Sequence, residues 1–313
     1  MLSRVADSLY WMSRYIERAE HTARLLDVHL NLLLESGGDA TSARWNRLIE
    51  ALEQEVNDPN MDDYRFMYLM SFDTTNPQSI AASVALAREN ARQVREQVST
   101  EMWNHLNGFY LALRQQDMDT VWNNQPHEFF RLVREGSHMF QGITDSTMVR
   151  GEGWHFIQLG RYIERAISII ALVDVQLRQA AMKKVDRLSM LEYFDWMSFL
   201  KCCTAFEAYC KLFTADLQPD RIVSFLLFDD SFPHSLRFCM ERIGEDIDTI
   251  AATTGVSRSS KLARMIGRVR SQLSYDEISD VMANAHHYLQ DMRHQCLHIH
   301  DAIYETFIYR PVG

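Results

Sequence analysis

The sequence predicts an all-α fold, a bundle of long helices built from two tandem copies of one multi-helix unit. Apolar residues recur at alternating spacings of three and four, which is the period of one face of an α-helix. The 313 residues include only 12 Gly and 6 Pro, whereas a loop-rich β protein uses more of both. No stretch sustains the alternation of apolar and polar residues that is typical of a strand.

A six-residue segment, Arg-Tyr-Ile-Glu-Arg-Ala, occurs twice. It occupies residues 14–19 and 161–166, and 161 minus 14 gives an offset of 147. Asp27 and Asp174 match at the same offset. The apolar seams around the copies keep one heptad rhythm; they begin with Val5, Leu9, Met12, Ile16 and Ala19, and with Phe156, Leu159, Ile163, Ala166 and Ile170. These matches predict a duplication, with repeats at 1–147 and 148–313 in one continuous globular unit.

A second landmark repeats later in each copy. Phe72-Asp73 is followed by Pro77, and Phe228-Asp229 is followed by Pro233, so 228 minus 72 gives an offset of 156. The order of landmarks is therefore the same, with a short insertion in the second copy. Asn76 is expected to cap a helix that has Pro77 at its first position, where the missing N–H costs nothing.

Helix periodicity and end signals set the expected elements of both copies. The first helix should run from Ser3 to Glu35, about 50 Å at 1.5 Å per residue. Capping-box spacings at Ser189–Glu192 and Ser274–Glu277 indicate two later starts. In the first copy we expect a helix from 77 toward 113, a polar loop at 115–125 and a helix at 129–140. In the second we expect helices at 154–183, 189–213, 233–253, 261–273 and 276–307.

The stretch from Leu9 to Asp27, which contains Glu17-Arg18, resembles the opening of the bacterial alpha-E domain family. The stretch from Met148 to Gly160 is similar to that family's midpoint, and the resemblance covers nearly the whole chain. It implies an all-helical fold with a Glu-Arg motif. It also implies partners, since members occur in fusions or neighbouring genes with circularly permuted ATP-grasp ligases and transglutaminase-like proteins.

Composition narrows the function further. A formal charge of −10 disfavours a nucleic-acid surface, and no apolar run is long enough to span a membrane. Five Cys, with Cys202 and Cys203 adjacent, do not suit a disulfide framework, so we expect a cytoplasmic location. The known phosphate loops, nucleophile elbows and zinc-protease spacings are absent, which argues against an enzyme and predicts no cofactor. A homo-oligomer is compatible with all of this.

The repeated charged residues are candidates for contact with a partner or a ligand. They are Arg14, Glu17, Arg18, Arg161, Glu164 and Arg165. At 100° per residue, the charged positions lie well away from the apolar seam. Three interpretations stay open: a solvated face of ion pairs, a buried Glu–Arg network that fixes helix orientation, and a contact surface for a partner.

A polar stripe on the last helix gives an alternative site. His287, Asp291, His294 and His298 follow one another at steps of 4, 3 and 4, and Asp301 and Glu305 continue the series. Histidines four residues apart on a helix can face one divalent metal ion, although a third ligand must come from another element. A water-facing stripe beside the apolar seam explains the pattern equally well.

These observations lead to two functional hypotheses of different classes. The first is a non-catalytic accessory or scaffold subunit that binds an ATP-grasp type amide or peptide ligase in a peptide-modification pathway. The second is a metal- or ligand-binding helical-bundle enzyme that uses the C-terminal His/Asp stripe. The missing catalytic spacings favour the first.

Overall fold

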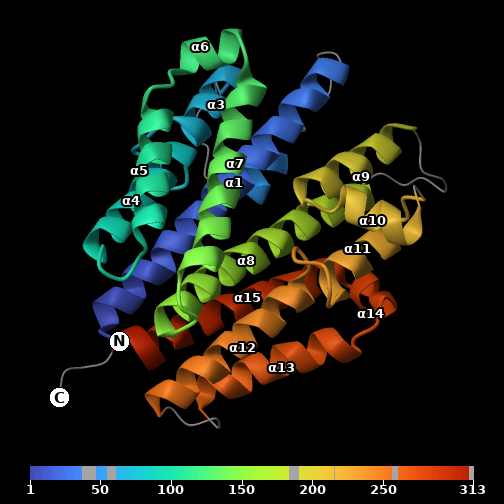
Figure 1. Cartoon of the computed structure of the whole chain (residues 1–313). Coiled ribbons are helices and arrows are strands. Elements are labelled where there is room, and N and C mark those ends of the chain that lie inside the picture. Colours follow the sequence, from blue (N-terminus) through green and yellow to red (C-terminus); the bar gives the residue numbers. More distant parts are fainter. Residues whose placement is uncertain (37–46, 55–60, 183–189, 215, 256–259, 310–313) are drawn as a thin grey trace. The chain divides into compact units, whose positions relative to one another are not determined.

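The computed structural model describes residues 1–36, 47–54, 61–182, 190–214, 216–255 and 260–309 (Figure 1). Every regular element within these ranges is a helix, which confirms the predicted all-α class. The first helix, α1 (Ser3–Ser36), has almost the predicted bounds. None of the helices in the described ranges combines the length and the apolar character required to cross a membrane.

The chain forms two compact units. Unit 1 comprises Met1–Gly37, Glu55–Glu164 and Phe307–Gly313, and unit 2 comprises Gly38–Gln54 and Arg165–Thr306. The division between them falls inside the long helix α8 (Glu152–Met182). These units are defined by packing, whereas the repeats 1–147 and 148–313 were inferred from sequence matches, so the repeat boundary stays a prediction.

Unit 1 is organised around α1. This helix packs against α4 (Ile80–Gln93) and α7 (Pro126–Thr147), and α5 (Thr100–Arg114) packs against both of those helices. Unit 1 also contains the short helices α3 (Asp63–Ser71) and α6 (Met118–Asn123) and the first part of α8, up to Glu164. The seam of α1 supplies the core of the unit, because its apolar side chains are fully buried; they include Leu9, Met12, Ile16, Ala19, Ala23 and Leu26.

Unit 2 contains the remaining helices. In its described part α12 (Leu236–Thr254) packs on α13 (Lys261–Tyr275), and α13 packs on α15 (Ala285–Ile303). The helix α11 (Pro219–Phe228) contacts α12. The other elements are α9 (Met190–Cys202), α10 (Phe206–Phe213) and α14 (Ile278–Ala283). The π-helical η2 (Tyr304–Ile308) begins in unit 2, and its last two residues belong to unit 1.

The predicted helix from 77 to 113 is wrong as one element, because it divides into α4 and α5. Each begins at a serine: Ser79 Oγ accepts a hydrogen bond from the N–H of residue 82, and Ser99 Oγ accepts one from residue 102. Asn76 is not the helix cap. Its side chain bonds within the preceding turn, donating to the Leu69 carbonyl at 3.1 Å. Pro77 therefore lies in that turn, before the first helical residue.

The last predicted helix is also divided. Its residues form α14 and α15, and α14 begins after Glu277. The capping box at Ser274 is wrong, since Ser274 lies inside α13 and donates its hydroxyl to the Arg270 carbonyl at 2.8 Å. The polar stretch 115–125, expected as a loop, contains α6. Ser189, the other predicted cap, lies outside the described residues.

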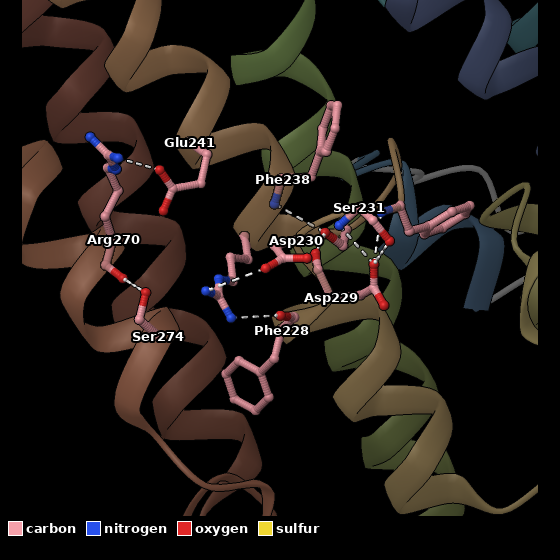
Figure 2. A network of polar contacts seen from close by, with 11 residues as sticks. Phe228, Asp229, Asp230, Ser231, Phe238, Glu241, Arg270 and Ser274 are labelled. Carbon is pink, nitrogen blue, oxygen red and sulfur yellow. Dashed lines mark hydrogen bonds and ion pairs between the residues drawn. The ribbon is translucent and has the colours of Figure 1, made fainter. Parts of the chain in front are cut away.

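The two Phe-Asp landmarks form similar turns. In unit 2, Figure 2 shows Asp229 beside Ser231, whose N–H and hydroxyl both donate to Asp229 Oδ1 at 2.9 Å. In unit 1, the N–H and hydroxyl of Thr75 donate to Asp73 Oδ1 at 2.8 and 2.7 Å. An aspartate bonding the backbone two residues on is an Asx-turn. The shared geometry supports the duplication, which itself remains a prediction.

Candidate functional site: a buried glutamate–arginine centre

Glu164 of α8 is held between two arginines of α1, all within unit 1. Arg14 Nε donates to Glu164 Oε2 at 2.7 Å, and Arg18 Nε donates to Oε1 at 2.6 Å. The side chains of Arg14 and Glu164 are less than a tenth exposed, and that of Arg18 is 19% exposed. Both carboxylate oxygens therefore have a charged donor. Such charge-assisted bonds are short and strong.

The environment keeps all three groups charged. Burial by itself would raise the pKa of Glu164, but Arg14 and Arg18 outweigh it and lower that pKa from 4.5 to about 2. Burial also works against the charged form of Arg14, yet Glu164 raises the pKa of this guanidinium overall. Arg14 further stacks on Trp11, with its guanidinium carbon 4.4 Å from the ring centroid. The carboxylate cannot serve as a proton donor near neutral pH.

Glu17 lies beside this centre and is also buried, at 3% exposure. It accepts a hydrogen bond from Gln141 Nε2 of α7 at 3.0 Å. One turn further along α1, burial lowers the pKa of His21 although the acidic neighbours Glu20 and Glu17 favour its charged form. Its Nε2 has no hydrogen-bond partner among the described residues. Burial therefore favours the neutral form of His21, although the side chains of Glu17 and Glu20 lie close to it.

The second motif copy is divided between the units. Arg161 belongs to unit 1, is 7% exposed and lies with its guanidinium carbon 5.9 Å from the Tyr162 ring centroid. Arg165 belongs to unit 2, where its Nη1 donates to the Pro233 carbonyl at 3.0 Å. The two Glu-Arg pairs therefore have different surroundings, even though their sequences are identical.

The solvated-face interpretation of the motif is wrong, and the buried-network interpretation is confirmed for Arg14, Arg18 and Glu164. The angular argument correctly placed these residues away from the apolar seam, but it assumed that a helix has one buried side. In unit 1, α1 is contacted by both α4 and α7, so its charged face meets protein as well. Direct contact between a partner and the six repeated charged residues of the two motif copies stays a prediction.

Comparison with known proteins identifies the family of the chain. Residues 1–308 match the model of Alpha-E, described as a predicted alpha-helical domain with a conserved ER motif. The chain belongs to the Alpha-E family. Glu17-Arg18 and Glu164-Arg165 are the two places where this Alpha-E chain carries the Glu-Arg dipeptide within its repeated segment.

Curated relatives of this Alpha-E chain are mycobacterial. Uncharacterized proteins of Mycobacterium bovis and of two strains of Mycobacterium tuberculosis are each 23% identical to it over 331 residues. The alignments cover 92% of this chain but 36% of each relative, so the chain spans about a third of their length. No solved structure matches.

The C-terminal stripe lies on α15 of the Alpha-E chain, as its spacing predicted. His287 and Asp291 are both exposed and lie 3.4 Å apart, and His294 and His298 are also exposed. Within the described ranges, no three His, Cys, Asp or Glu side chains gather so that they could hold a metal ion. Metal binding at the stripe remains a prediction, and no cluster of ligand side chains in the described ranges supports it.

Sequence reasoning missed two aspartate–histidine pairs. In unit 1, His127 Nδ1 lies 2.6 Å from Oδ1 of the buried Asp27, and Arg134 contacts the other oxygen at 3.0 Å. In unit 2, His286 Nδ1 lies 2.7 Å from Asp174 Oδ1. An ionised carboxylate only accepts, so each Nδ1 carries the proton. Each imidazole, 41% and 58% exposed, is therefore fixed in one tautomer.

The sequence held a usable indication of these pairs. Asp27 and Asp174 match at the motif offset of 147, and a buried acid repeated in a duplication should have a repeated partner. His127 and His286 are the residues that fit, since each is the second residue of a helix that follows a short one. In the structure the pairs tie α1 to α7 and α8 to α15.

Proposed function

We propose that this Alpha-E chain is a non-catalytic accessory subunit that binds an ATP-grasp type amide or peptide ligase in a peptide-modification pathway. The observation that carries the proposal is the buried Glu164 centre. Both carboxylate oxygens of Glu164 accept hydrogen bonds from arginines of α1, and these bonds hold α8 to α1. The repeated Glu-Arg segment thus contributes to a helical framework. We expect a framework of this kind to function by binding other proteins at its surface.

The relatives support a role beside other components. In the mycobacterial proteins, the part that aligns with this chain is 36% of a longer polypeptide. A segment that occurs within a larger protein is suited to working with a neighbouring domain or subunit. The ATP-grasp ligase as that neighbour, with a transglutaminase-like protein as a second one, follows from the family resemblance given above.

The free cysteines support the proposed location of the chain, and its charge and exposed apolar side chains support the proposed type of contact with the partner. All five cysteines are free thiols, which supports the proposed cytoplasmic setting. The net charge of −10 favours a partner with a basic docking face, because complementary charge speeds association and sets orientation. Exposed large apolar side chains can supply affinity at such a face; those on unit 1 are Met1, Leu2, Tyr68, Leu111, Met139, Val149 and Tyr309.

The test is co-expression of the chain with an ATP-grasp protein encoded beside it, followed by affinity purification and size-exclusion chromatography. We expect a stable complex that carries out ATP-dependent ligation, while the isolated chain hydrolyses no ATP. The complex should weaken as salt rises, because exposed charges are screened.

A matched pair of variants tests the role of the centre. Glu164→Gln should weaken the complex by disturbing the framework, whereas Glu89→Gln, at an exposed ion pair with Arg92 on α4, should leave it unchanged. ATP-dependent ligation by the isolated chain would disprove the accessory role. Failure of every encoded ATP-grasp protein to co-purify would disprove the proposed partner.

A further inference from the structure

A groove lies between α13 and α15, wholly within unit 2. It has a cavity volume of about 500 Å³ and is lined by residues of these two helices and the start of η2. Pockets of this size hold small ligands when an apolar surface is combined with a few well-placed polar groups. This groove has both components.

The two helices run antiparallel along the groove. Lys261, at the start of α13, contacts Glu305 at 3.4 Å, and Gln272, near the end of α13, accepts a hydrogen bond from Gln295 at 3.3 Å. Advancing along α13 therefore means moving backwards along α15. At 1.5 Å per residue, the two contacts lie about 16 Å apart. The groove runs between them.

The floor of the groove is apolar. Val269 and Ile299 are fully buried beneath it, and Ala302 is 3% exposed. Met265 is partly buried and adds a flexible thioether side chain, which adapts readily to different apolar shapes. An aliphatic side chain laid on this floor would lose contact with water, which is favourable.

The rims carry exposed groups of opposite charge. Arg268 lies on the α13 side, and His298 and Asp301 lie on the α15 side. None of the three side chains has a hydrogen bond or ion pair with any residue that the structure describes. Other arginines of unit 2 do have acidic partners, such as Arg242 with Glu245 at 2.6 Å.

Antiparallel pairing places these groups along the groove. Counting from the Lys261–Glu305 contact, Arg268 lies opposite His298, whereas Asp301 lies opposite Met265. Asp301 is three positions after His298, which is about 4.5 Å along the helix axis. The cationic and anionic groups are thus displaced along the groove and lie on opposite rims. The distance across the groove adds to this axial displacement of about 4.5 Å.

We propose that this groove binds a short peptide with free amino and carboxyl ends. The carboxylate pairs with the Arg268 guanidinium, whose planar fork suits two-point contact. The ammonium group pairs with Asp301, and an apolar side chain packs against Met265, which is partly exposed above the buried floor. An extended dipeptide spans about 7 Å between its ends, which exceeds the axial displacement of about 4.5 Å, so the ligand runs obliquely across the groove from one rim to the other. His298, which lies opposite Arg268, can donate a second hydrogen bond to the carboxylate.

The inference goes beyond the proposed accessory role and does not rest on it. The groove and its charges belong to unit 2, whereas the Glu164 centre belongs to unit 1. Peptide binding would occur in the purified chain without any ligase. A failure to bind peptide would leave the accessory role standing, and a failure to bind a ligase would leave the groove's ligand unaffected.

The experiment is titration calorimetry of the purified full-length chain with the dipeptide Leu-Leu at low salt. We expect saturable binding of one dipeptide per chain. N-acetyl-Leu-Leu and Leu-Leu amide each lose one terminal charge and should bind at least about tenfold more weakly, about 1.4 kcal/mol. Free leucine should bind as weakly as the blocked peptides, because it cannot reach both rims.

Variants locate the site. Arg268→Gln and Asp301→Asn should each weaken Leu-Leu binding about tenfold or more, and Arg268→Lys should weaken it less because the charge is kept. Arg242→Gln, an exposed arginine on α12 of the same unit, serves as the matched control and should bind normally. Circular dichroism checks that each variant is folded.

Four results would overturn the proposal, and the first three concern Leu-Leu and its blocked forms. These three are no saturable binding of Leu-Leu, equal binding of the blocked peptides, and unchanged binding in the Arg268 and Asp301 variants. Equal affinity for free leucine and Leu-Leu would also reject a peptide as the ligand, since it would show recognition of a single amino acid.

Discussion

At the scale of single residues, the Glu164 centre shows how burial and pairing compete. Removing a carboxylate from water is unfavourable, and here two guanidinium groups within hydrogen-bond distance more than compensate. The same balance makes each member dependent on the others. A charge that loses its partner stays buried, so the cost of removing one partner exceeds the benefit that the pair provided.

Glu164→Gln should therefore be strongly destabilising. It leaves Arg14 and Arg18 without a counter-charge in a buried site, a defect that costs about 3–5 kcal/mol. Urea unfolding followed by circular dichroism measures the change. Glu89→Gln, which breaks an exposed Arg–Glu pair in the same unit, is the control and should shift the midpoint little. Similar midpoints for the two variants would contradict the buried-network interpretation.

The same residue predicts a pH dependence. The folded state lowers the pKa of Glu164 from 4.5 to about 2, so its stabilising contribution is complete above about pH 4.5. That contribution is lost as the pH falls from about 4.5 to about 2. The stability gap between wild type and Glu164→Gln should shrink across this window. Urea midpoints measured from neutral to acid pH test this, and a constant gap would count against it.

At the scale of helices, the approach of α8 to α1 depends on one glycine. A Cβ at Gly160 would lie 2.2 Å from the Tyr10 carbonyl oxygen, so no larger residue fits without moving the helix backbone. This close approach brings Glu164, one turn further along α8, within reach of Arg14. Gly160 thus sets the helix spacing, and the ion pairs act on the spacing that results.

Gly160→Ala should separate the two helices and destabilise unit 1 by about 1–3 kcal/mol, as overpacked sites do. Gly108→Ala, inside α5, is the matched control, because its added Cβ meets nothing within 4 Å. Alanine is the better helix former, so this control should raise stability by about 0.5–1 kcal/mol. Thermal unfolding of both variants gives opposite shifts if the close approach matters. Equal shifts would reject it.

Local patterns predicted the helices better than they predicted where helices stop. The bounds of α1 followed from its seam and the glycines after it. The break between α4 and α5 was missed because apolar spacing continues through residues 94–99, while the decisive event is the bond that Ser99 accepts from residue 102. Serine caps compete with helix continuation only when the chain can turn there, which depends on tertiary packing.

At the scale of the whole chain, the sequence repeat is accompanied by repeated chemistry. Each unit contains a buried aspartate that receives a histidine from the first turn of a long helix, Asp27 with His127 and Asp174 with His286. The second donors differ: Arg134 in unit 1, and Gln290 with Arg178 in unit 2. The duplication would explain the common part, and divergence of the copies would explain the difference.

Asp27→Asn and Asp174→Asn should therefore destabilise the chain by similar amounts, about 1–3 kcal/mol each, since either change disturbs a buried acceptor that has two or more donors. Their effects should add in the double variant, because the described partners of the two carboxylates are different residues. Urea unfolding of the three variants measures this. A cost at one site only would argue that the pairs are not equivalent.

The candidate site was only partly predictable. The repeated letters identified Arg14, Arg18 and Glu164, but the link between residues 14 and 164 depends on how α8 meets α1. The stripe was correctly placed on one helix, α15. A metal site there needs a third ligand from another helix, and whether such a ligand is near depends on how the helices pack. The groove was missed because it arises from two helices whose antiparallel pairing no local pattern encodes.

Arg14 and Arg18 share one counter-charge, Glu164, and this restricts which substitutions the sequence can accept at these three positions during evolution. A single substitution at position 164 leaves two stranded cations, and a change at one arginine removes only half of the neutralising charge. Lineages that lose the centre must therefore change several positions together or first acquire stability elsewhere. Among divergent relatives, we expect these three positions to be retained or replaced as a set, with uncharged residues of similar volume arriving jointly.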